Sequence, residues 1–177
     1  MSFDCFVAAL PLPVLQLIFS HVLEQQGSSV GLCLVSAVCK SWSEAVQSDP
    51  SWQHINIPKT QADCFDDYSL KHLALKAKNQ LQSIKLHACR RLSTFCILEV
   101  LLNSKQLKQV SIISCPQMAC YNFKYYLEAV LKQPRHHRHL EQLCFTNTHN
   151  TYSDRACKGL AEQEGIKVML LSHGHAV

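Results

Sequence analysis

Two stretches of this 177-residue chain, LQSIKLHACRRL at 81–92 and LKQVSIISCPQM at 107–118, align without a gap and decide its fold. Apolar residues occupy the first, fourth, sixth and twelfth places of both stretches, and a cysteine occupies the ninth place. Alternate side chains of a strand point to the same face, so the fourth and sixth residues are expected to face a core. The pattern predicts the same strand in two successive repeats, which begin 26 residues apart.

This spacing resembles the leucine-rich-repeat pattern L-x-x-L-x-L-x-x-C-x-L, whose repeats have roughly 20–29 residues, although the last apolar residue comes one place later here. Weaker copies begin at Trp52, Leu140 and Ile166, which gives successive spacings of 29, 26, 33 and 26 residues. The core-facing residues of these copies are expected to be Ile55, Ile57, Leu143, Phe145, Met169 and Leu171. Such repeats stack into a curved solenoid.

A helix candidate follows each of the first four strands, at 67–78, 94–102, 121–132 and 153–164. Asp66 and Ser93 are expected N-caps, because their side chains can accept hydrogen bonds from the first free N–H groups of a helix. Cys89 and Cys115 are interpreted as structural thiols under the strands and not as reactive ones, since no sequence feature around them lowers a thiol pKa.

Residues 1–50 have a different pattern, that of three short helices. The first helix has Pro13 in its first turn, the second runs through Leu32 to Val35, and the third is expected from about Val38 to Gln47. At about 100° per residue, the first helix gathers five apolar residues within about 140° and leaves Leu17 and Leu23 outside that arc. So small a unit buries little core, so its surplus apolar surface is expected to pack either on the rest of the chain or on a separate protein.

Composition and missing motifs exclude several classes of function. The net charge is only +4, and the one concentrated basic stretch is PRHHRH at 134–139, so no nucleic-acid partner is expected. The start of the chain lacks a basic segment, and no apolar run of about 18 residues occurs, so neither a signal peptide nor a membrane helix is expected. The ten cysteines are therefore expected to be free thiols in the cytoplasm or the nucleus.

The cysteines and histidines do not have the spacing of a metal site. No CxxC and no HExxH occurs, so neither a metal nor another cofactor is expected. His136, His137 and His139 are interpreted as part of a solvated loop, near the insertion that lengthens the 33-residue spacing. The alternative, in which these three histidines bind a metal or sense pH, has no carboxylate or cysteine at ligand spacing to support it.

Residues 10–52 resemble an F-box. The shared features are Leu10-Pro11, the apolar helix that follows, VCKSW at 38–42, and Trp52. Together with the repeats, the whole chain resembles the F-box/leucine-rich-repeat proteins that are plentiful in plants. It departs from the F-box pattern in two places: Leu12-Pro13 stands where the family often has an acidic residue, and LEQQGSSVG at 23–31 is longer than is common.

The resemblance implies an α/β chain with a three-helix F-box at 1–50 and a short right-handed leucine-rich-repeat solenoid at 51–177, its parallel sheet on the concave face. It implies a non-catalytic substrate receptor of a Skp–cullin–F-box ubiquitin ligase, which directs a protein substrate to ubiquitination and proteasomal degradation. The Skp-type adaptor, and through it a cullin, would be the partners of the F-box. The residues implied at the adaptor are Leu10, Pro11, Val14, Leu15, Ile18, Val35, Val38, Cys39 and Trp42.

Strand alternation predicts which residues point away from the core, and the resemblance implies that they meet an unidentified protein substrate. They are Ser83, Lys85, His87, Gln109, Ser111, Ile113, Gln142, Cys144 and Thr146.

Two other interpretations stay open. In the first, the chain is a repeat scaffold whose N-terminal helices only cap the solenoid, since terminal repeats need a cap. In the second, the chain is a thiol hydrolase, but no GxSxG, no P-loop and no paired-carboxylate motif supports an enzyme.

Overall fold

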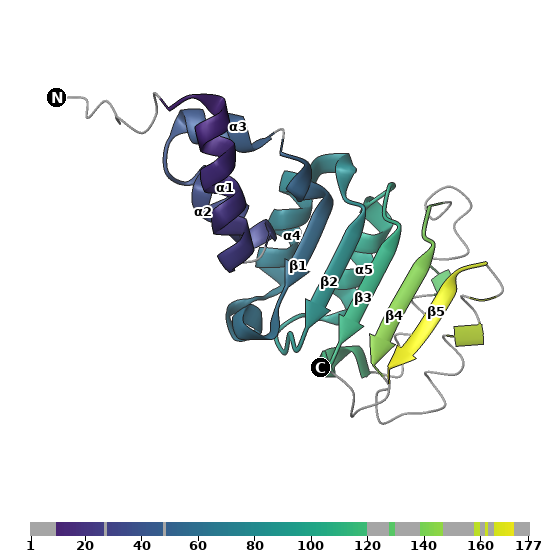
Figure 1. Cartoon of the computed structure of the whole chain (residues 1–177). Coiled ribbons are helices and arrows are strands. Elements are labelled where there is room, and N and C mark those ends of the chain that lie inside the picture. Colours follow the sequence, from purple (N-terminus) through teal and green to yellow (C-terminus); the bar gives the residue numbers. More distant parts are fainter. Residues whose placement is uncertain are drawn as a thin grey trace.

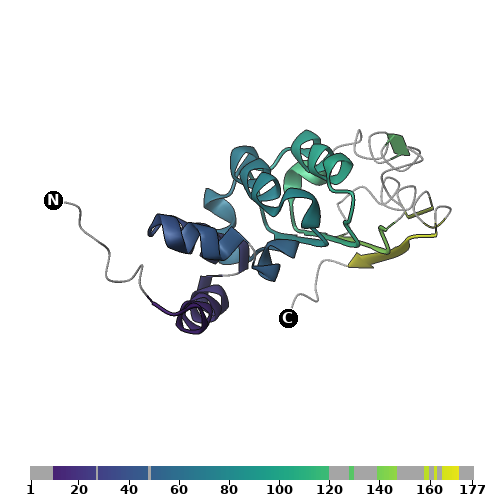
Figure 2. The same cartoon turned by 90° about the horizontal axis from the view of Figure 1, so that it is seen from above.

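The computed structural model describes residues 10–26, 28–47, 49–119, 128–129, 139–146, 158–159, 162 and 165–171. Three helices lead into a five-stranded parallel sheet, whose strands lie side by side in chain order (Figure 1). Helices α4 (Asp67–Ala77) and α5 (Thr94–Asn103) cover one face of this sheet (Figure 2). The fold is therefore mixed helix and parallel sheet, with a helical region at its N-terminal end.

The N-terminal helices are α1 (Leu12–Gln26), α2 (Ser28–Ser36) and α3 (Lys40–Gln47). Pro13 lies in the first turn of α1, as predicted. The third helix begins two residues later than expected, because the chain reverses first: the N–H of Val38 donates to the carbonyl of Val35 at 3.2 Å in a tight turn after α2. Val38 and Cys39 therefore precede α3.

These helices share their core with the sheet. Helix α2 packs on strand β1 (His54–Ile57). A short 3-10 helix, η2 (Pro50–Gln53), connects α3 to β1, and its buried Trp52 donates from Nε1 to the carbonyl of Val46 at 2.8 Å. One cluster of buried apolar side chains runs from Leu15 in α1 to Ile166 beside the last strand.

The strands occur where the repeat predicts them. They are β1, β2 (Ser83–His87), β3 (Gln109–Ile113), β4 (Gln142–Thr146) and β5 (Lys167–Leu171). Short 3-10 helices follow β1 (η3, Lys59–Cys64), α4 (η4, Lys78–Gln80) and β3 (η5, Pro116–Ala119). Ile84 pairs with Val110 and Leu86 with Ile112, so the register is that of the ungapped alignment. The expected helices at 121–132 and 153–164 lie outside the described residues, except for 128–129, 158–159 and 162.

Strand β5 is present as predicted, but the residues predicted to face the core are wrong by one position. Val168 pairs with Leu143, and Leu170 with Phe145, so Met169 points away from the core and keeps 36% of its surface exposed. Leu171 shares the phase of Met169 and pairs with Thr146. A shift of one residue turns every side chain of a strand to the other face, which explains why a pattern aligned on Ile166 chose the wrong set.

The two cysteines of the aligned stretches are buried, as predicted. The residue before each of them adopts a left-handed conformation, with φ of 59° at Ala88 and 55° at Ser114. This conformation turns the chain under the strand, so that the Cys115 thiol lies 3.5 Å from the carbonyl oxygen of Ile113. The same backbone feature therefore recurs at the same place in successive repeats.

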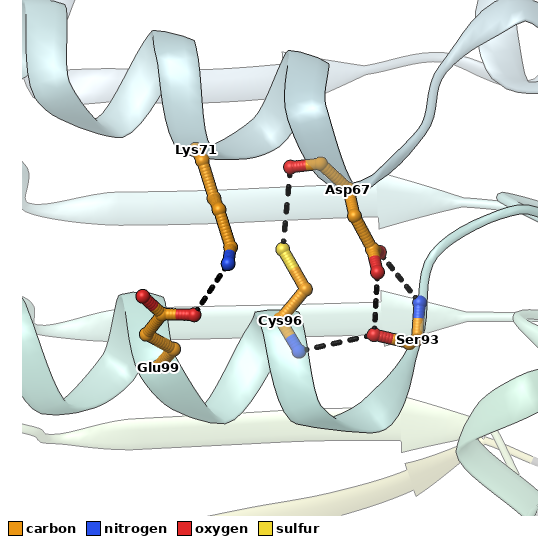
Figure 3. A network of polar contacts seen from close by, with 5 residues as sticks. All are labelled: Asp67, Lys71, Ser93, Cys96 and Glu99. Atoms are coloured by element: carbon orange, nitrogen blue, oxygen red, sulfur yellow. Dashed lines mark hydrogen bonds and ion pairs between the residues drawn. The ribbon is translucent and has the colours of Figure 1, made fainter.

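A polar network joins α4 to α5 (Figure 3). The Asp67 carboxylate accepts hydrogen bonds from the N–H of Ser93 at 2.7 Å and from its hydroxyl at 2.6 Å. The Ser93 hydroxyl oxygen in turn accepts from the N–H of Cys96 at 3.1 Å, which is the predicted N-cap of α5. One turn further along both helices, Lys71 Nζ lies 2.7 Å from a carboxylate oxygen of Glu99. These contacts link two neighbouring strand–helix units.

The predicted cap of α4 is also present. Asp66 accepts from the N–H of Ser69 at 2.9 Å and from its hydroxyl at 2.8 Å. These hydrogen bonds, the backbone one foremost, lower the pKa of the Asp66 carboxyl below its ordinary value, because they stabilise its charged form.

Candidate functional site

Helix α1 is built around a buried stripe. Leu15 and Phe19 enter the core, where the ring of Phe19 meets Trp42 of α3 edge-on, with 5.4 Å between ring centroids and 66° between ring planes. Aromatic pairs favour this geometry, which adds about 0.5–1.5 kcal/mol to the burial of the rings themselves. Helices α1 and α3 are therefore held together by residues that are not available to a partner.

Other apolar residues of these helices remain in solvent. The exposed fractions are 55% for Leu12, 42% for Val14, 74% for Leu17, 54% for Leu34 and 50% for Val38. Val14 and Leu17 are three residues apart on α1, which places their side chains side by side on one face of the helix. Leu34 and Val38 are four residues apart, at the end of α2 and in the turn after it. These five residues are here called the helical apolar surface.

The residues implied at the adaptor divide by burial. Pro11, Val14 and Val38 are exposed, while Leu10, Ile18 and Cys39 are half-buried. The remaining three are buried in the core: Leu15, Val35 and Trp42. As the structure stands, the buried three can act on a partner only by holding the helices that present the others.

Sequence reasoning missed Leu12, Leu17 and Leu34 as members of this surface. A signal was present for Leu17, because it lies outside the arc that α1 turns toward its core. No comparable signal exists for Leu34, since the neighbouring positions of α2 are apolar as well and every face of this short helix looks alike.

The second candidate lies on the sheet. The face opposite α4 and α5 is here called the second sheet face, and it presents the outward residues of each strand. Lys85 and Gln109 are exposed there, and His87, Ser111, Ile113 and Gln142 are half-buried, as predicted for strand positions that point away from the core.

Two outward positions differ from the expectation of a solvated face. Ser83 is buried, because His54 of the neighbouring strand covers it, with His54 Nδ1 2.8 Å from the Ser83 hydroxyl oxygen. Cys144 is also buried, between Ser111 of β3 and Met169 of β5. The side chain of Thr146 lies outside the described part of the chain.

The outward residues of β2 to β5 enclose a cavity of about 380 Å³. Met169 lines it together with six of the predicted residues: Lys85, Gln109, Ser111, Ile113, Gln142 and Cys144. A volume of this size falls within the usual range of about 300–1,000 Å³ for ligand pockets. The structure thus brings most of the predicted second-face residues around one hollow.

A second cavity, of about 480 Å³, lies where α2 meets η3 and α4. Its lining is mostly apolar and includes Val30, Cys33, Phe65 and Leu73. Burial raises the pKa of the Cys33 thiol, and the positive charge of Lys76 offsets part of that rise. A raised pKa lowers the fraction of nucleophilic thiolate at neutral pH.

Buried thiols include Cys89 and Cys115 beneath the strands and Cys96 in α5. The neighbouring Cys115 thiol and burial both raise the pKa of Cys89, and burial followed by the Asp67 carboxylate raises the pKa of Cys96 to about 12. The pKa of the Cys115 thiol is lowered instead, because it accepts a hydrogen bond from the Cys89 thiol. Its burial in the turn nevertheless closes it to a substrate.

In the described ranges, no group of three or more His, Cys, Asp and Glu side chains is placed to hold a metal ion. His139 is exposed, whereas His136 and His137 lie outside the described residues. None of the helices described here has the length and apolar character needed to cross a membrane.

The helical end of the molecule matches a known family. Residues 7–58 match the family model described as F-box-like. The N-terminal helical region is F-box-like. The match covers α1 to α3 and continues through Trp52 and β1, so it includes the strand on which α2 packs.

One relative matches a larger part of the chain. F-box protein SKIP14 of Arabidopsis thaliana is 26% identical over 101 residues, which cover 51% of this chain and 22% of that protein. The chain thus spans less than a quarter of the relative's length. The two matches support an F-box protein, and the helical apolar surface lies within its F-box-like region.

Proposed function

We propose that this chain is a non-catalytic substrate receptor of a Skp–cullin–F-box ubiquitin ligase. Its F-box-like region docks on a Skp-type adaptor, which recruits the cullin, and the strand–helix units hold a protein substrate for ubiquitination and proteasomal degradation. The observation that carries the proposal is the helical apolar surface, which the chain's own sheet leaves exposed.

A partner docked on these helices would remove the helical apolar surface from water. Each buried methylene group contributes about 0.8 kcal/mol, so five exposed aliphatic side chains on so small a unit form a favourable contact for a partner. Val14 and Leu17 lie side by side on α1, and apolar side chains that cluster on the surface of a soluble protein mark interaction sites more often than scattered single residues do. An F-box-like region that presents such side chains fits a role in adaptor binding.

The sheet region is proposed to be a short right-handed leucine-rich-repeat solenoid at 51–177, with its second sheet face concave, after an F-box at 1–50. Three observations support this proposal: the parallel strands follow chain order, α4 and α5 share one face, and the left-handed turn recurs before Cys89 and Cys115. The proposed location is the cytoplasm, the nucleus or both.

A scaffold without ligase activity is the second candidate. The packing of α2 on β1 and the hydrogen bond of Trp52 to Val46 favour it, because an N-terminal cap needs these same contacts. In that case the helices would need no partner, and their exposed apolar side chains would have no binding role.

The deciding experiment is a pull-down with a purified Skp-type adaptor and a cullin. Wild type is expected to retain the adaptor and, through it, the cullin. The double variant Val14→Asp plus Leu17→Asp is expected to retain neither, because it places two charges on the docking surface while both positions are solvent-exposed in the folded chain.

The matched control is Leu75→Asp, a leucine of α4 with a 75% exposed side chain. This variant is expected to retain the adaptor, and circular dichroism is expected to show that all three proteins are folded. Failure of wild type to bind the adaptor would favour the scaffold, and equal binding by the double variant would place the docking surface elsewhere.

A further inference from the structure

The described outward positions of the second sheet face carry charge of one sign. Strand register places twelve outward positions with described side chains there: His54, Asn56, Ser83, Lys85, His87, Gln109, Ser111, Ile113, Gln142, Cys144, Lys167 and Met169. Lys85 and Lys167 are exposed cations, and none of these twelve positions is an aspartate or a glutamate. At these positions, a carboxylate brought to the face therefore meets lysine side chains and no acidic one.

The cavity on this face combines that charge with an apolar floor. Cys144 is buried, Ile113 is half-buried, and Met169 adds a polarisable thioether, which accepts from Gln142 Nε2 at 3.6 Å. The exposed Lys85 also lines the cavity. Gln109 and Gln142 pair across β3 and β4, and their amides can both donate and accept hydrogen bonds. A volume of about 380 Å³ accommodates one large aliphatic or aromatic side chain with its neighbouring backbone.

We propose that the second sheet face binds an acidic peptide segment of the substrate, with one apolar side chain seated in the cavity beside Lys85. The inference rests on the proposed function, whose substrate class it names. The carboxylates of the segment pair with Lys85 and Lys167, and its backbone hydrogen-bonds to the amides of Gln109 and Gln142. A basic segment is rejected by like charge, so the two lysines supply selectivity in addition to affinity.

The test is selection from a phage-displayed library of random peptides about twelve residues long on the immobilised full chain. Selected peptides are expected to contain about twice the library's share of Asp and Glu, with an apolar residue next to an acidic one. The same selection on Lys85→Glu is expected to lose this enrichment. The matched control is Lys76→Glu, since Lys76 is an exposed lysine of α4, which covers the opposite face of the sheet.

A selected peptide, labelled with fluorescein, is then titrated by fluorescence anisotropy. Its affinity is expected to fall about tenfold with Lys85→Glu and to fall again in high salt, while Lys76→Glu leaves it unchanged. Enrichment of neutral or basic peptides, no enrichment, or equal affinity for the two lysine variants would overturn the inference. Equally tight binding of a single-stranded DNA of about twelve nucleotides would also overturn it, since the face would then attract polyanions in general.

The same preparations are tested for adaptor binding, which separates the two proposals. Adaptor binding without acidic selection overturns only the substrate class. Acidic selection without adaptor binding overturns the ligase role and leaves a peptide-binding scaffold.

Discussion

Truncation of Leu17 to alanine measures the helical apolar surface directly. The side chain is 74% exposed on α1, so its loss removes few contacts within the chain. If the adaptor covers the exposed part, Leu17→Ala removes three carbon atoms from the interface. At about 0.8 kcal/mol for each fully buried carbon, scaled by the exposed fraction, the loss is about 1.8 kcal/mol. That corresponds to an adaptor Kd about 20-fold weaker.

The chain offers an unusually close control for this measurement. Leu75 is the same residue type on α4 with 75% of its surface exposed, so Leu75→Ala removes the same atoms from an equally exposed position. Isothermal titration calorimetry with a purified Skp-type adaptor compares the two variants with wild type. Thermal unfolding is expected to give the same Tm for all three, within about 2 °C, since surface truncations change stability little.

The result that would refute the reasoning is equal affinity of Leu17→Ala and Leu75→Ala. Such a result would mean that the exposed face of α1 is ordinary solvated surface. A lower Tm for Leu17→Ala alone would mean that the side chain contributes to the core, and the affinity change would then have to be measured against that loss.

Three further predictions concern stability. Gly31→Ala is expected to lower Tm by about 2–4 °C, because the new Cβ would lie 3.2 Å from the carbonyl oxygen of Val22 on α1. The overpacking costs about 1–3 kcal/mol, which outweighs the gain in helix propensity. A raised Tm would contradict the close approach of α1 and α2. Ala88→Gly is expected to leave Tm unchanged or to raise it, since a φ of 59° suits glycine. The control Ala74→Gly, in the middle of α4, is expected to lower the free energy of unfolding by about 1 kcal/mol. Equal losses of stability in the two variants would contradict a strained turn at Ala88. The pKa of Asp66 is lowered in the folded chain, so its cap contributes stability above the unfolded pKa of about 3.9, and this stability is lost as the pH falls through the folded pKa. Asp66→Asn is expected to flatten the pH dependence of the free energy of unfolding, measured in urea, in that acidic range. An unchanged pH profile would show that the cap is not coupled to the ionisation of Asp66.

Much of the sheet could be predicted because its signals are local and repeated. The alignment of 81–92 with 107–118 predicted the pairing of Ile84 with Val110 and of Leu86 with Ile112. The caps at Asp66 and Ser93 depend only on a short polar side chain before a helix, and both are present. The prediction of the inward residues in the last and weakest copy was wrong. Val168 and Met169 are both apolar, and only the pairing with β4 distinguishes the inward residue from the outward one.

The candidate sites were harder to predict than the strands. Alternation correctly selected outward residues such as Lys85 and Gln109, but it could not show that Cys144 forms the floor of a cavity, since that depends on Met169 from a strand 25 residues away. On α1, the apolar arc comprised Val14, Leu15, Ile18, Phe19 and Val22. Leu15 and Phe19 are buried in the core, but Val14 of the same arc is 42% exposed. The arc could not show which of the remaining apolar side chains α2 and α3 would leave uncovered.

The sequence by itself determined where the strands and the caps of α4 and α5 lie, because side-chain periodicity and hydrogen bonding to the nearest turn act over a few residues. Only the tertiary structure decided which leucines stay in solvent and which way the last strand faces. Those outcomes depend on partners brought together from distant parts of the chain: Leu17 is exposed because α2 and α3 pack on the other side of α1, and Met169 points outward because β4 sets the register of β5.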